Sequence, residues 1–92
     1  MTDELLDLLD SAIDAVASLK DTGWSSYNRP EDFVADLLAL RAGIAGGDCG
    51  SAKRLRLIFA PTGDWDECVG PGGAAGELAN RISELLIQRL KA

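Results

Sequence analysis

The chain has 92 residues, of which 47% are hydrophobic and 26% are charged, and its formal net charge is −6. This length fits one domain with one hydrophobic core, and it argues against a deep substrate cavity inside that core. Because an acidic surface repels nucleic-acid phosphates and anionic membranes, we expect neither as a partner. The charge either keeps the protein soluble or attracts a basic partner protein.

The acidity is concentrated in the first half of the chain. Residues 1–48 hold ten acidic and three basic side chains, whereas residues 49–92 hold five acidic and six basic ones. The acidic start, Met1-Thr2-Asp3-Glu4, differs from a signal peptide, and no uncharged stretch approaches the ~20 residues of a membrane-spanning helix. We therefore expect a cytoplasmic protein with free thiols at Cys49 and Cys68, the alternative being a disulfide between them.

Residues 3–20 predict an amphipathic helix, because apolar residues recur every three to four positions. Thr2 is the expected N-cap and Gly23 the expected end. Four aspartates share the polar face of this helix: Asp3, Asp7, Asp10 and Asp14. The aspartates form a solvated face, recognise a basic partner, or pair within the protein or its dimer, where Lys53, Arg54 and Arg56 are candidates.

A short connection over residues 23–29 carries Trp24 and Tyr27, which either cover the core or form a contact site. Pro30 predicts the first turn of a second helix, because its fixed φ suits that position and its missing N–H costs nothing there. Asn28 is the expected N-cap of this helix. The pair of glycines at 46–47 is its expected end.

Residues 51–59 fit either a helix or a strand. The alternation over residues 54–57 is typical of a strand, but a lone strand would have no partner, so we predict a short helix that ends near Ala60, before Pro61. A long connection follows over 61–73, and the periodicity predicts a last helix over 74–90. Together these elements predict an all-α fold: a small antiparallel bundle of about four helices in a single domain, residues 1–92.

The 61–73 connection contains two candidate sites. The first is the acidic and aromatic run Asp64-Trp65-Asp66-Glu67, in which the indole either contacts a partner or covers one end of the bundle, and in which three carboxylates are a weak metal-binding alternative. The second is the loose glycine pattern Gly70, Gly72 and Ala75 before the last helix. Such a loop is either a plain turn or a phosphate cradle at a helix N-terminus.

No catalytic constellation is visible in the sequence. The chain has no histidine, so neither the two cysteines nor the serines have the base that would activate them as nucleophiles. Isolated cysteines without histidine also argue against a zinc site. We therefore expect a protein that is not an enzyme and that uses no metal or other cofactor.

The run Leu57-Ile58-Phe59-Ala60-Pro61-Thr62-Gly63 resembles an L-[LI]-F-A-P-T-G stretch that recurs in small uncharacterised bacterial helical proteins. The resemblance covers about a third of the chain and implies no activity. In size and acidity the chain is also similar to bacterial immunity proteins, which bind a toxin.

The function that we expect is that of a small acidic protein-binding module, immunity- or antitoxin-like, without catalytic activity. One alternative is a homodimeric scaffolding protein, and a second is a small-ligand or phosphate-binding protein. The candidate partner-binding residues are Asp3, Asp7, Asp10, Asp14, Trp24, Tyr27, Asp64, Trp65, Asp66 and Glu67.

Overall fold

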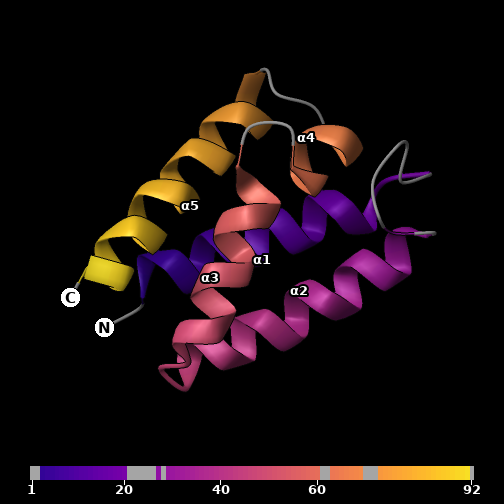
Figure 1. Ribbon diagram of the computed structural model, residues 1–92. Helices are drawn as coiled ribbons and strands as arrows, with labels where there is room; N and C mark the ends of the chain where they lie inside the picture. The colour runs from indigo at the N-terminus through magenta and orange to yellow at the C-terminus, as the bar shows by residue number, and fades with distance from the viewer. Residues whose placement is uncertain (1–2, 21–26, 28, 61–62, 70–72, 92) are drawn as a thin grey trace.

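The computed structural model describes residues 3–20, 27, 29–60, 63–69 and 73–91. These residues form the helices α1 (Glu4–Ala17), α2 (Pro30–Ala45), α3 (Cys49–Phe59), α4 (Asp64–Cys68) and α5 (Gly73–Lys91). The first two helices run antiparallel to each other, and so do α3 and α5 (Figure 1). The predicted all-α antiparallel bundle is confirmed, with one short helix more than expected. None of the helices in the described part is long and apolar enough to span a bilayer.

The four long helices surround a shared core. α1 packs against α2 and α5, and α3 packs against the same two helices, so that α1 and α3 lie across the bundle from each other (Figure 1). Each helix turns its predicted apolar stripe inward, as Leu9, Phe33, Leu55 and Ile82 illustrate with less than 2% of their surface exposed. Burying one side chain of this size contributes about 1.5–3 kcal/mol, which makes the core the main source of stability.

The helix ends differ in detail from the predictions. Asp3 is the N-cap of α1, and its Oδ1 accepts the Leu5 N–H at 3.0 Å. Pro30 occupies the first turn of α2 as predicted, but Arg29 precedes it without a capping side chain. The prediction of Gly46 as the end of α2 is confirmed. The predicted caps Thr2, Gly23 and Asn28, which lie outside the described residues, are wrong, because Asp3, Ser18 and Arg29 hold these positions.

A helix is confirmed for the ambiguous segment, and it starts two residues earlier than predicted. Asp48 is its N-cap, accepting the Ser51 backbone N–H at 3.0 Å and the Ser51 hydroxyl at 2.7 Å. The first of these bonds satisfies a backbone donor that a helix start would otherwise leave free, and the second holds the Ser51 side chain beside the cap. The Asp48 cap therefore favours a helix here over the strand that the alternation of residues 54–57 suggested.

The prediction of an irregular connection is wrong for residues 64–68, which form α4. Gly63 precedes it and lies against the last turn of α3, where its N–H donates to the Ala60 carbonyl at 2.9 Å. A Cβ at this position would lie 2.4 Å from the Leu57 carbonyl oxygen and 2.7 Å from that of Ile58. Only glycine fits so close an approach, which gives the last residue of the LIFAPTG run a structural reason.

Candidate protein-interaction surface

Two of the four aspartates on α1 are engaged within the fold. Asp3 pairs with Arg89 of α5 at 2.7 Å, and Asp10 pairs with Arg41 of α2 at 2.7 Å. The hydrogen bond from Arg89 holds the pKa of Asp3 below its ordinary value, against the opposing effect of burial. The interpretation of internal pairing therefore holds for these two residues. Their partners are Arg41 and Arg89, and the expected cluster at 53–56 contributes neither.

The other two aspartates, Asp7 and Asp14, are exposed and have no ion pair among the described residues. Their backbone carbonyls accept the hydroxyls of Ser11 and Ser18. Because both follow one face of α1, this side of the molecule carries unpaired negative charge.

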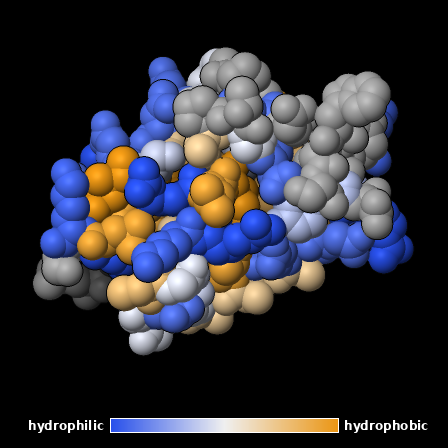
Figure 2. Space-filling view, in the orientation of Figure 1, coloured by the Kyte–Doolittle hydropathy of each residue, from blue (hydrophilic) through white to orange (hydrophobic). Residues whose placement is uncertain are grey.

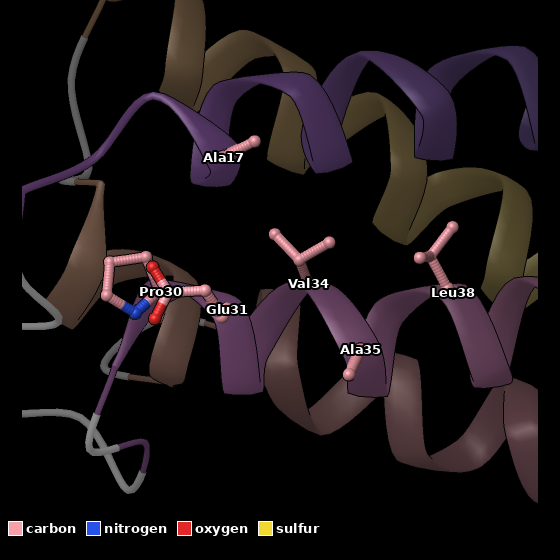
Figure 3. A pocket seen from close by; sticks show the side chains of 6 residues that line it. All are labelled: Ala17, Pro30, Glu31, Val34, Ala35 and Leu38. Carbon is pink, nitrogen blue, oxygen red and sulfur yellow. The ribbon is translucent and has the colours of Figure 1, made fainter.

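An apolar groove of about 270 Å³ lies between the end of α1 and the first half of α2. Its lining consists of Ala17 from α1 and Pro30, Glu31, Val34, Ala35 and Leu38 from α2. Figure 3 shows Val34 and Leu38 projecting from α2 on the side where Ala17 ends α1. Half of the Leu38 surface is exposed to solvent. Of the six lining residues, Glu31 carries a carboxylate and the other five have hydrocarbon side chains.

The groove exists because α2 is apolar on its outer face as well as on its inner face. Its inner positions are filled by core residues such as Phe33 and Leu37, and its exposed positions also carry apolar side chains. These exposed residues are Ala35, Leu38, Ala39, Ala42 and Ala45. Contiguous exposed apolar side chains often mark contact sites, so the outer face of α2 is a candidate surface for a partner.

The acidic face of α1 borders this groove. Asp14 lies one turn before Ala17, and the Asp10–Arg41 pair joins α1 to α2 one turn beyond Leu38. The arrangement therefore places unpaired negative charge along one wall of an apolar groove. The sequence indicates the four aspartates, but the alanines at exposed positions of α2 mask its second apolar face.

Tyr27 covers the core, which is one of the two roles considered for it. Its ring stacks on Phe33 with the centroids 4.4 Å apart, and its hydroxyl donates to the Asp36 carboxylate. Burial together with this carboxylate raises the pKa of the phenol. Arg54 lies 3.8 Å from the same carboxylate. Trp24, the companion candidate, lies outside the described residues.

Trp65 is fully buried, so the structure shows it covering the core and leaves no exposed surface of the indole for a partner. Its indole N–H donates to the Ala75 carbonyl at 3.1 Å, and its ring lies 5.0 Å from that of Phe59. Asp64 and Asp66 are partly exposed beside it. Across the described part of the chain no group of three or more acidic, cysteine or histidine side chains could hold a metal ion.

Three other residues that the sequence marked as candidates lie, in part or in full, outside the part of the chain that the structure describes. The side chain of Glu67 and the glycine-loop residues Gly70 and Gly72 lie outside the described residues. Cys49, at the start of α3, is an exposed free thiol, and Cys68, at the end of α4, is a half-buried one.

The outer face of α3 carries a second surface that the sequence analysis did not identify. Leu57 is 65% exposed there and lines a shallow hollow of about 320 Å³ together with Lys53, Arg56 and Ala60. In the view with α3 in front, separate hydrophobic areas stand among hydrophilic side chains (Figure 2). The helical spacing of residues 53, 56, 57 and 60 would have shown this face once the segment was taken as a helix.

No family model, curated protein or solved structure matches the chain. The candidate functional regions of the described chain are the groove between α1 and α2 and the outer face of α3.

Proposed function

We propose that the protein is a binding module without catalytic activity, and that its groove between α1 and α2 binds a basic amphipathic helix of a partner protein. The observation that carries this proposal is the half-exposed Leu38 in an apolar groove, whose α1 wall ends at Ala17, one turn after the unpaired carboxylate of Asp14. An amphipathic helix laid in an apolar groove is a recurrent mode of peptide recognition.

The spacing of the groove residues suits a helical ligand. Val34 and Leu38 are one turn apart on α2, so two apolar side chains of a ligand, also one turn apart, pack against them in register. Lysine or arginine side chains at the edge of that ligand then lie near Asp14. The carboxylates guide the ligand and set its orientation, whereas burial of the apolar side chains supplies most of the affinity.

This proposal narrows the set of biological roles. An immunity- or antitoxin-like protein that holds a basic segment of another protein is one role with this chemistry. The two free thiols are compatible with a reducing compartment, and we place the protein in the cytoplasm. A second copy of this chain is one partner that the same groove can bind.

The test uses an amphipathic peptide of leucine and lysine, about four helical turns long, titrated into isotopically labelled protein. We expect NMR shift changes centred on Ala17, Val34, Ala35 and Leu38. The affinity should fall as salt rises from 0.1 M to 1 M, because the Debye length shrinks from about 10 Å to about 3 Å. A peptide with glutamate in place of lysine should bind at least about tenfold more weakly.

Two matched variants locate the site. Leu38→Gln should weaken peptide binding, whereas Leu57→Gln, at the other large exposed leucine of the described residues, should not. Asp7→Asn combined with Asp14→Asn should reduce the salt dependence of the affinity for the peptide. Glu77→Gln combined with Glu84→Gln is the control, because it removes the same amount of charge from α5. Equal effects of the two leucine variants would refute the groove as the binding site.

A further inference from the structure

The two large hydrophobic side chains exposed within the described residues lie in surroundings of opposite charge. Leu38 lies in the groove that is bordered by Asp14 and Glu31, and Leu57 lies between Lys53 and Arg56. Among the described residues, neither Lys53 nor Arg56 has an ion pair. Their positive charges are therefore unpaired, as are the negative charges of Asp7 and Asp14 on α1. One surface is thus acidic and apolar, and the other is basic and apolar.

The outer face of α3 has the chemistry that the groove is proposed to bind. Lys53, Arg56, Leu57 and Ala60 follow one another at helical spacing on the side of α3 that faces away from the core. Arg54, in contrast, turns toward α2, where it meets Asp36. The exposed part of α3 is therefore a basic amphipathic helix with one central leucine.

The two surfaces lie on different sides of the bundle. α3 packs against α2 and α5, whereas the groove is formed by α1 and α2, and α1 and α3 lie across the bundle from each other (Figure 1). A copy that offers its α3 face to the groove of a neighbour keeps its own groove open. Such a contact is heterologous and allows a third copy to join in the same way.

We infer that the protein self-associates head to tail, with the α3 face of one copy docked in the α1–α2 groove of the next. Leu57 of the first copy lies against Leu38 of the second, and Lys53 and Arg56 lie near the carboxylates of Asp14 and Glu31. This inference rests on the groove of the proposed function and names a second copy of this chain as its occupant.

The contact is small, because it joins one shallow groove to one helix face. Contacts of this size belong to the weak and transient class, so the dissociation constant should be roughly 10 µM to 1 mM. High salt should weaken it several-fold, because the charges involved are exposed and therefore screened.

Sedimentation equilibrium of the full chain over that concentration range tests the inference. The wild type should form dimers and larger species as its concentration rises, and 1 M salt should shift it toward the monomer. A wild type that stays monomeric at about 1 mM would overturn the inference. A species that stops at the dimer and survives in the Leu57→Gln variant would overturn it too, because that result indicates a symmetric contact.

Complementary variants test the direction of the contact. Leu38→Gln alters the groove and keeps the α3 face, and Leu57→Gln alters the α3 face and keeps the groove, so each variant alone should be monomeric. Mixed in equal amounts they should form a one-to-one complex that grows no further. A mixture that remains monomeric, although the wild type associates, would overturn head-to-tail docking.

A charge variant gives a second reading that does not depend on the leucines. Lys53→Gln combined with Arg56→Gln, both at exposed positions, should weaken wild-type association about tenfold and remove most of its salt dependence. Unchanged association would count against the inference. Binding of the leucine and lysine peptide by a monomeric wild type would leave the proposed function standing while the inference fails, and loss of both would remove both.

Discussion

At the scale of single residues, Trp65 shows how a side chain suited to an interface serves the interior. The short α4 directs it against Phe59, with ring centroids 5.0 Å apart, and the Ala75 carbonyl accepts its indole N–H. The buried donor is therefore satisfied, which an indole in a core requires. One side chain ties the end of α3 to the start of α5.

Replacing Trp65 tests how much its side chain contributes to the free energy of unfolding. Trp65→Ala should lower the free energy of unfolding by about 3–5 kcal/mol, because it leaves a large cavity. Leu57→Ala, which trims an exposed leucine on the neighbouring helix, should change it by less than about 0.5 kcal/mol. Urea denaturation followed by circular dichroism measures both, and similar values for the two variants would contradict the buried position of Trp65.

The sequence could not decide between the two roles of Trp65, because each is compatible with a tryptophan among acidic residues. The choice depends on α4, whose direction follows from the close approach of Gly63 to the last turn of α3. For Tyr27 the decisive partner was Phe33, six positions along the chain in the first turns of α2. In both cases the aromatic neighbour sets the outcome.

At the scale of elements, helix periodicity located α1 and α5, because each has a continuous inner stripe, whereas α3 was predicted because a lone strand would have no partner. Periodicity could not reveal the outer face of α2, since alanines on that side blur the contrast on which the method depends. The start of α3 could have been found, because Asp48 and Ser51 have the spacing of an N-cap and its partner. The alternation of Leu55 and Leu57 obscured that signal.

The crossing of α2 and α3 depends on Gly43. A Cβ at this position would lie 1.9 Å from the Ser51 hydroxyl oxygen and 2.8 Å from the Ser51 Cβ, and Asp48 holds that hydroxyl in place. Alanine normally stabilises a helix interior relative to glycine. Gly43→Ala should nevertheless destabilise the fold by about 1–3 kcal/mol, because it forces the two helices apart.

Thermal unfolding of two matched variants checks this prediction. Gly46→Ala, at the C-cap of the same helix, places its Cβ at ordinary contact distance and should be neutral or stabilising by up to about 1 kcal/mol. Combining Gly43→Ala with Ser51→Gly should recover part of the loss, since the clash disappears. A stabilised Gly43→Ala variant would show that α2 and α3 have more room than the structure indicates.

At the scale of the whole molecule, α1 and α5 are joined by two ion pairs between residues far apart in the chain. Arg81 binds Glu4 at 2.8 Å, and Arg89 binds Asp3 at 2.7 Å while donating to the Ile44 carbonyl near the end of α2. Arg89 therefore links three helices at one end of the bundle. The sequence contained both partners of each pair, but only the topology brings residues this distant together.

These pairs predict how stability responds to acid. Hydrogen bonds from the arginines hold the pKa of Asp3 and of Glu4 below their ordinary values of 3.8 and 4.5. Because the unfolded chain binds protons more readily at these sites, their contribution is complete above about pH 5 and is lost as the pH falls through the lowered values. Stability should thus decline between about pH 5 and 2.

Urea denaturation at a series of pH values measures this decline. The variant that combines Asp3→Asn with Glu4→Gln should be less stable at pH 7 and should lose less on acidification than the wild type. Asp7→Asn combined with Asp14→Asn removes two carboxylates of α1 without an ion pair and should unfold in parallel with the wild type. Parallel curves for all three proteins would contradict the role of the α1–α5 pairs.

The ion pair between Asp3 and Arg89 also determines which end of the bundle is suited to attaching another molecule. Both ends of the described chain lie at this end of the bundle, whereas the groove opens at the far end of α1, about 20 Å away along the helix axis (Figure 1). A neighbouring domain, a resin or a fluorophore joined to either end would leave the groove pointing outward. The fold thus holds both ends of the described chain at one end of the bundle and the groove at the other.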